Sequence, residues 1–274
     1  MNQTPCSPSA NPAGKPAEGG QAAVRTFKIW RGNASGGGLK DFTAEISPGM
    51  VVLDAVHQIQ ARNAPDLAVR WNCKAGKCGS CSAEINGKPR LMCMTRMESL
   101  PPGEVTIQPL KAFKPIKDLV TDVSWNYEVK KKIAPFTPKA PEADGTWRMQ
   151  QYEVERVQEF RKCIECFLCQ DTCHVLRDHG KHEEFAGPRF FVHAAQLEMH
   201  PLDTQDRSEW LKKTGSIGYC NITKCCTEVC PEHIHITDNA IIPLKERLAD
   251  QYYDPVVKLF RWVFKRKTVE PRTT

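Results

Sequence analysis

The stretch CKAGKCGSC, residues 73–81, spaces its cysteines as C-x4-C-x2-C, and Cys93 follows twelve residues later. This is the spacing with which plant-type centres bind a 2Fe-2S cluster through four thiolates. A loop that wraps two irons must turn sharply, and Gly76 and Gly79 supply that backbone freedom. A structural zinc site is the alternative, although such sites more often use paired C-x2-C units. The predicted 2Fe-2S ligands are Cys73, Cys78, Cys81 and Cys93.

A second run, CIECFLCQDTC at residues 163–173, has the spacing C-x2-C-x2-C-x3-C. In this bacterial ferredoxin pattern the first three cysteines bind one cluster and the fourth binds the other cluster of a pseudo-symmetric pair. A matching second run is therefore required.

Residues 220–231, CNITKCCTEVCP, supply that run with one change. Superposing the pattern aligns Cys220, Cys226 and Cys230 with its first, third and fourth cysteines, and it places Thr223 at the second position. A hydroxyl is a poor ligand for iron that prefers thiolate, so this centre should lack its fourth iron and be a 3Fe-4S cluster.

The two runs together therefore predict two ligand sets. We expect the 4Fe-4S cluster to be held by Cys163, Cys166, Cys169 and Cys230, and the 3Fe-4S cluster by Cys173, Cys220 and Cys226. Cys225 is one residue out of register but near the vacant position. We interpret it as a buried spectator thiol, with ligation as the alternative, because adjacent side chains rarely point at one metal.

The whole composition fits a metal-binding protein of a reducing compartment. The chain has 274 residues, 41% of them hydrophobic, and thirteen cysteines, an odd number whose C-x2-C spacings argue against disulfides. Its net charge of +6 is scattered, so nucleic acid is not an expected partner. No signal peptide or membrane span is expected.

The sequence predicts a small α+β unit at residues 24–115, a linker at 116–146 and a helical unit at 147–252. Residues 1–23 should form a disordered tail, and residues 253–274 a basic amphipathic segment. In the first unit we expect a hairpin of strands 24–30 and 40–46 joined by the glycine-rich turn 35–38, and a helix at 51–61. Further helices are expected at 148–162, 189–199 and 239–252.

The order of these motifs resembles the iron–sulfur subunit of the succinate dehydrogenase and fumarate reductase family over about Val24–Tyr252, and the run 161–177 is similar to that of high-GC Gram-positive bacteria. The resemblance implies an N-terminal plant-type 2Fe-2S ferredoxin (β-grasp) domain followed by a mainly α-helical bacterial-ferredoxin-like domain. It also implies a flavoprotein partner with FAD and a membrane anchor of the cytochrome b type, with haem left open. Electrons would pass from flavin through the 2Fe-2S, 4Fe-4S and 3Fe-4S clusters to quinone, on the cytoplasmic face of the bacterial inner membrane.

The resemblance fails at two positions. Members of the family place a tryptophan and a histidine of the quinone pocket where this chain has Asp178 and Asn221, so these quinone-binding residues are not carried over. One hypothesis is that His174, Asp178 and His179 deliver protons near the last cluster, and the alternative is a solvated polar loop. The histidines of this segment could also suggest a further metal, but surface histidines are the simpler interpretation.

No phosphate-binding loop, nucleophile elbow or acid/base pair is present, so we expect no catalytic residue here and no binding of the dicarboxylate. The sequence does not decide between succinate oxidation and fumarate reduction. A free-standing multi-cluster ferredoxin and a zinc-stabilised interaction protein are the competing classes. Residues 255–267 form an amphipathic pattern that would rest on an anionic bilayer or dock on protein.

Overall fold

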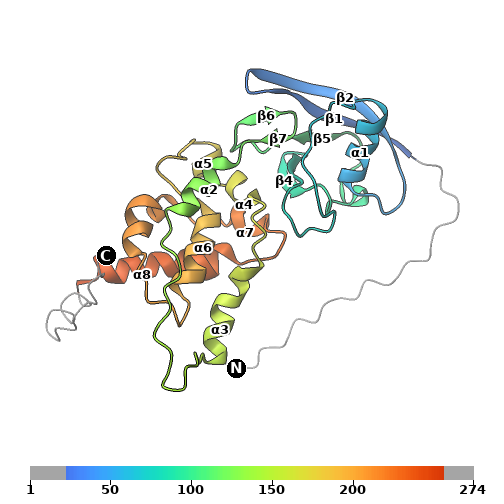
Figure 1. The fold of residues 1–274 in the computed structure, drawn as a ribbon. Coiled ribbons are helices and arrows are strands. Elements are labelled where there is room, and N and C mark those ends of the chain that lie inside the picture. Colours follow the sequence, from blue (N-terminus) through green and yellow to red (C-terminus); the bar gives the residue numbers. More distant parts are fainter. Residues whose placement is uncertain (1–22, 256–274) are drawn as a thin grey trace, which may run out of the picture.

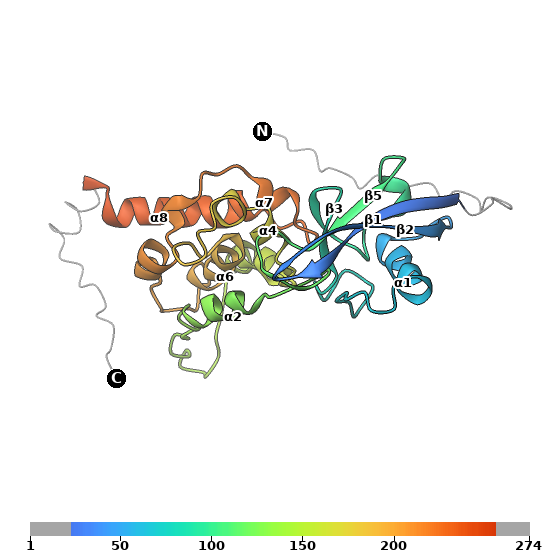
Figure 2. The same cartoon turned by 90° about the horizontal axis from the view of Figure 1, so that it is seen from above.

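A computed structural model describes residues 23–255 of the chain. Residues 1–22 of the tail predicted at 1–23, and residues 256–274 of the amphipathic segment predicted at 253–274, lie outside the described residues. A half that carries a β-sheet and a helical half lie end to end (Figures 1 and 2). Within residues 23–255, no helix is long and apolar enough to cross a membrane.

The first half is built on a mixed sheet in the order β4-β3-β5-β1-β6-β7, with β2 paired to β1. The long strands β1 and β2 form the expected antiparallel hairpin, and β5 runs parallel to β1. The strands are β1 (Ala23–Asn33), β2 (Gly36–Ile46), β3 (Ser82–Ile85), β4 (Lys88–Leu91), β5 (Val105–Gln108), β6 (Pro115–Lys117) and β7 (Val120–Thr121).

The turn predicted at residues 35–38 is wrong, because those glycines lie in β2 and the chain turns at residues 34–35. Gly37 pairs with Gly32 across the hairpin. A Cβ at Gly37 would lie 2.6 Å from the Trp30 ring and 2.8 Å from the Gly32 Cα. The glycines therefore let the two strands and the indole pack closely, which is a different use from closing a turn.

The helix expected at 51–61 is confirmed as α1 (Val52–Arg62). Its apolar face, which includes Val52, Val56 and Ile59, is fully buried in the core of this half. The Asp54 side chain accepts a hydrogen bond from the Val51 N–H at 3.2 Å and so satisfies a free donor at the helix start.

The stretch predicted as a linker is partly folded, since it contains the end of β6, β7 and α2 (Ser124–Lys131). Trp125 in α2 packs against the hydrophobic cores of both halves. Its indole N–H donates to the His182 carbonyl at 3.0 Å. One aromatic residue thereby ties the connection to both parts of the molecule.

All elements described after Thr121 are helices, so sheet and helices are segregated as in an α+β fold. The α-helices are α3 (Gln151–Gln158), α4 (Leu168–Asp171), α5 (His174–Arg177), α6 (Pro188–Glu198), α7 (Cys225–Glu228) and α8 (Ile242–Tyr252). Turns of 3-10 helix lie at Met97–Ser99, Glu159–Lys162 and Ile217–Tyr219, and π-helical turns at Trp210–Thr214 and Ile236–Ile241.

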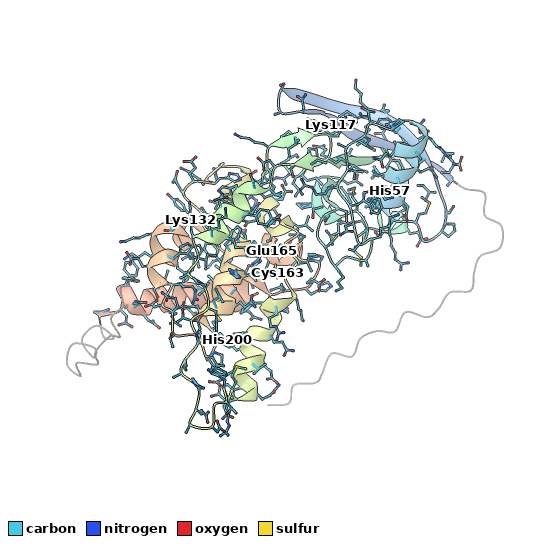
Figure 3. All side chains as sticks on the ribbon, viewed as in Figure 1. His57, Lys117, Lys132, Cys163, Glu165 and His200 are labelled. Carbon is cyan, nitrogen blue, oxygen red and sulfur yellow. The ribbon has the colours of Figure 1, made fainter. Side chains whose placement is uncertain are left out.

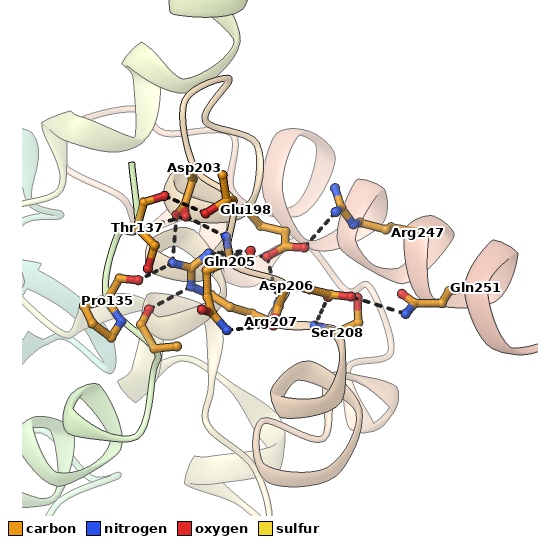
Figure 4. Close-up of polar contacts among 12 residues, drawn as sticks. Pro135, Thr137, Glu198, Asp203, Gln205, Asp206, Arg207, Ser208, Arg247 and Gln251 are labelled. Atoms are coloured by element: carbon orange, nitrogen blue, oxygen red, sulfur yellow. Dashed lines mark hydrogen bonds and ion pairs between the residues drawn. The ribbon is translucent and has the colours of Figure 1, made fainter. Parts of the chain in front are cut away.

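The side chain of Arg207 is fully buried and joins three segments of the helical half (Figure 4). Its guanidinium donates to the carbonyls of Ala134 and Pro135, each at 2.8 Å. It also pairs with Asp203 at 2.8 Å and with Glu198 at 3.5 Å. The extended stretch that follows α2 is thus fastened to the end of α6 and the loop after it.

The half-buried His193 in α6 leads to a pH prediction. Burial and, to a smaller extent, the cations Arg189, Lys130 and Arg207 lower its pKa to about 4 against the opposing charge of Glu165. Between pH 6.5 and 4 the unfolded chain therefore binds a proton that the folded chain does not. Stability is then lost as the pH falls through this window, by up to about 2 kcal/mol at pH 5.

We expect the melting temperature of the protein to fall more between pH 7 and pH 5 in the wild type than in His193→Gln, which has no titrating imidazole. Equal falls in the two proteins would contradict the assignment.

Candidate metal centres

The first cysteine loop has the tight backbone that its sequence requires. Gly76 and Gly79 adopt left-handed φ angles of +68° and +67°. The Cys73 sulfur is exposed and accepts N–H groups from Ala75 at 3.4 Å and Lys77 at 3.3 Å. Backbone amides that converge on a sulfur in this way stabilise a thiolate ligand.

The four predicted ligands of this loop interact with one another. Burial raises the pKa of Cys81 to about 12, although a hydrogen bond from the Cys93 backbone opposes the increase and the Cys93 thiol adds to it. For Cys78, burial is outweighed by hydrogen bonds to Ser80 and Cys73, which lower its pKa to about 6. Cys81 is therefore a neighbour in space of Cys93, which lies outside the loop, and Cys78 is a neighbour of Cys73 within it.

The second predicted set is also brought together. Cys163, Cys166, Cys169 and Cys230 line a single small cavity, although Cys230 comes from the other cysteine run. Cys163 and its neighbour Glu165 lie close to the end of α3, midway along the molecule (Figure 3). This cavity combines three cysteines of one run with the last cysteine of the next, the cross-connection that the sequence pattern predicts.

A second cavity, which corresponds to the third predicted centre, is lined by Cys173, Cys220 and Cys226. Thr223 and Cys225 line the same cavity. Lys245 donates to the carbonyl of Cys220 and fixes the start of this loop.

The second and third loops repeat one backbone pattern. Left-handed residues flank Cys166, with φ of 54° at Glu165 and 60° at Phe167. Left-handed residues likewise flank Thr223, with φ of 59° at Ile222 and 63° at Lys224.

The short helices α4 and α7 begin directly after these flanking residues, at Leu168 and at Cys225. Thr223 therefore occupies the structural position of Cys166. Cys225 corresponds to Leu168, a buried residue of the hydrophobic core. Cys225 itself is only partly buried, so the prediction of a buried thiol is wrong on that point, while its spectator role stays a prediction.

The chemistry of these thiols fits iron–sulfur clusters. All twelve cysteines in the described part of the chain are free of disulfides. Burial raises the pKa of Cys166 to about 12, that of Cys173 to about 11 and that of Cys169 well above its usual value, so buried thiolates here need a compensating cation. Between residues 23 and 255, no three His, Cys, Asp or Glu side chains are placed to hold a single metal ion. The cysteines instead line the walls of cavities.

Polar residues near the cavity of the third predicted centre contact one another. His174 Nδ1 lies 2.9 Å from an oxygen of Asp178, and its Nε2 lies 3.6 Å from the Cys225 sulfur. All three line an open cleft of about 630 Å³ between β4 and the helices α5 and α7. His179 has no part in these contacts, and the hypothesis of proton delivery stays a prediction.

Sequence reasoning missed a buried ionic cluster between the two halves. Glu84 of β3 and Asp171 of α4 have fully buried carboxylates, and Arg177 pairs with both. Lys111 pairs with Glu84 at 3.2 Å, and Asp171 accepts the Ala112 N–H at 2.9 Å. Residues this far apart in sequence, with no motif between them, leave no local signal.

Two family models match separate parts of the chain. Residues 26–128 match the 2Fe-2S iron-sulfur cluster binding domain, and residues 159–234 match the 4Fe-4S dicluster domain. These are the ranges that contain the first cysteine loop and the two later runs.

Relatives that match two thirds or more of the chain agree with both family models. The fumarate reductase iron-sulfur subunit of Haemophilus influenzae is 31% identical over 67% of this chain and 76% of that subunit. The succinate dehydrogenase iron-sulfur subunit of Paracoccus denitrificans is 27% identical over 86% and 92%. The chain spans only 43% of an uncharacterized iron-sulfur protein of Methanococcus maripaludis.

A solved structure gives a stronger likeness. A chain of the Mycobacterium smegmatis Sdh1 complex in its apo form is 60% identical, with 86% of this chain and 99% of that chain covered and a TM-score of 0.82. The chain described here therefore belongs to the family of iron–sulfur subunits of succinate dehydrogenase and fumarate reductase.

Proposed function

We propose that this chain is the electron-transfer subunit of a succinate dehydrogenase that reduces quinone. The observation that carries the proposal is the gathering of cysteines into two cavities. Each cavity is lined by cysteines of both later runs. Clusters bound there and in the first loop would supply one-electron steps between a two-electron flavin and quinone. The chain's own role is to hold these centres in a fixed row and to dock its partners.

The proposed ligands are those that the spacing predicts. The 2Fe-2S cluster would be bound by Cys73, Cys78, Cys81 and Cys93; the 4Fe-4S cluster by Cys163, Cys166, Cys169 and Cys230; and the 3Fe-4S cluster by Cys173, Cys220 and Cys226. The corresponding domains are a β-grasp unit of the plant ferredoxin type at residues 24–115, a linker at 116–146 and a bacterial-ferredoxin-like unit at 147–252.

The proposed partners are a flavoprotein with FAD and a membrane anchor of the cytochrome b type, with quinone near the third centre. Tyr219 and Ile222, on either side of Cys220 and Asn221, expose 49% and 39% of their surface. Apolar side chains exposed beside a cysteine loop favour a protein surface docked there. The chain would then be held peripherally on the cytoplasmic face of the bacterial inner membrane.

Electron paramagnetic resonance of the purified complex tests the proposal. Oxidised in air, it should show a 3Fe-4S signal that disappears with dithionite while a 2Fe-2S signal appears. A complex with 4Fe-4S signals only, beside the 2Fe-2S centre, would refute the assignment of the third centre.

Fumarate reduction is the second candidate, because relatives of both names match the chain. The 60% identity to the Sdh1 chain favours succinate oxidation. Assays of succinate:quinone reduction and of fumarate reduction by quinol in one preparation separate the two. Faster fumarate reduction would reverse the proposed direction.

A substitution at Thr223 gives a sharper prediction. Thr223→Cys restores the thiolate that the repeated loop lacks, and we expect the 3Fe-4S signal of the oxidised enzyme to be replaced by a 4Fe-4S signal after reduction. The matched control is Cys225→Ser, which should keep the wild-type signal because Cys225 corresponds to Leu168. A loss of that signal in the control would make Cys225 a ligand.

A further inference from the structure

The first and second cysteine loops touch through their backbones. Gly79 adopts a left-handed φ of +67°, and a Cβ at this position would lie 2.7 Å from the Cα of Cys166 and 2.9 Å from its Cβ. No side chain fits between these atoms. The sequence places Gly79 between two cysteines of the first loop, while Cys166 lines the cavity of the second set.

A hydrogen bond crosses the same contact. The hydroxyl of Ser82 lies 2.9 Å from the carbonyl oxygen of Gly79 and 2.9 Å from that of Cys166. A hydroxyl has one proton to donate, so the two carbonyls share it. Ser82 follows Cys81 in the chain. A route from the backbone of Cys81 through the Ser82 side chain to Cys166 therefore crosses only one hydrogen bond.

The surroundings keep this bridge in place. Cys166, Phe167 and Leu168 pack into the hydrophobic core of the first half, together with Cys81. The side chain of Glu165 is held by Lys130 at 2.6 Å and by Arg189. The approach of the two loops is thus fixed by packing on one side and by ion pairs on the other.

We propose that Ser82 is a positioning residue that provides the electronic contact between the first and second centres. Electron tunnelling weakens steeply with distance, and it weakens faster across an empty gap than along covalent or hydrogen bonds. The route runs from Cys81 along the Ser82 side chain and across its hydrogen bond to Cys166. One electron leaves the first centre and the second gains it, no bond forms or breaks, and Ser82 keeps its proton.

The inference rests on the proposed function, and its test measures more than turnover. In the complete purified complex, the rate at which an electron re-equilibrates between the two centres after flash photoreduction would be compared in wild type, Ser82→Ala and Ser82→Thr. Resonance spectra and midpoint potentials of both centres would be recorded for each protein. We expect Ser82→Ala to slow the transfer several-fold with unchanged spectra and potentials, and Ser82→Thr to retain the rate.

A wild-type rate in Ser82→Ala, or equal slowing in Ser82→Thr, would overturn the inference and leave the proposed function intact. Slowing that appears only with altered spectra or potentials would also overturn it, because the change would then be structural. A wild-type complex without the two signals would refute the proposed function itself.

A second pair of variants tests the same contact through the backbone. Gly79→Ala must push the loops apart, whereas Gly87→Ala, at a φ of +74° with nothing within 4 Å, has only the cost of the left-handed backbone. We expect slower transfer in Gly79→Ala and the wild-type rate in Gly87→Ala. Equal rates in these two proteins would show that the close approach has no role in the transfer.

Discussion

Replacing Arg207 with methionine should destabilise the helical half by about 3–5 kcal/mol, because it leaves the buried Asp203 without its cation and Glu198 with Arg247 alone. The side chains of Glu198 and Asp203 are 0% and 2% exposed. Burial already raises the pKa of Glu198, so its charge is costly even in the intact network. The carbonyls of Ala134 and Pro135 lose their donor as well.

Thermal unfolding of the purified complex, followed by circular dichroism and by cluster absorbance, measures this loss. The matched control is Arg148→Met, because Arg148 also pairs with two carboxylates but its side chain is 67% exposed. Exposed ion pairs contribute about 0–1 kcal/mol, so the control should melt near the wild type. Similar melting temperatures for the two variants would show that the buried network contributes little.

Gly187→Ala should be nearly as damaging, for steric reasons. A Cβ at Gly187 would lie 2.1 Å from the side-chain oxygen of Gln170 and 2.7 Å from Leu176, and φ there is +88°. Gln170 cannot move away, since it is fully buried and its amide donates to the Ala186 carbonyl at 3.0 Å. Overpacking and backbone strain each cost about 1–3 kcal/mol.

The displaced Gln170 is the neighbour of Cys169 in sequence, so we also expect Gly187→Ala to lower the iron content of the purified protein. Gly180→Ala separates the two causes. Gly180 has a φ of +61° but nothing within 4 Å, and its variant should lose only the backbone contribution, about 1 kcal/mol. Equal loss of iron in both variants would exclude the steric explanation.

The sequence alone was sufficient where chemistry dictates spacing. Thiolates that wrap a cluster must recur at fixed intervals, so the sequence predicts that Cys230 joins the second run, and in the structure Cys230 lines the same cavity as Cys163, Cys166 and Cys169. The position of Thr223 could be deduced in the same way. The structure adds the matching backbone, since left-handed residues flank both Thr223 and Cys166.

Contacts between the halves could not be predicted, because nothing in a local pattern records which distant residue is a neighbour. Ser82 reads as an ordinary strand residue, and Glu84 as an exposed charge of an alternating strand, yet Glu84 is 1% exposed beside Arg177. The glycines of β2 led to the wrong turn prediction for another reason. Glycine signals both turns and close packing, and only the partner strand distinguishes the two.

The packing of Cys166, Phe167 and Leu168 into the core of the first half has a consequence for how the protein is made. The sheet-bearing half leaves the ribosome before these three residues do, so its interior has an unfilled gap until they emerge. The two cysteine-bearing regions are therefore not interchangeable modules that could be cut apart, fused to other proteins or matured one at a time. The two regions belong to one chain because they share one hydrophobic core.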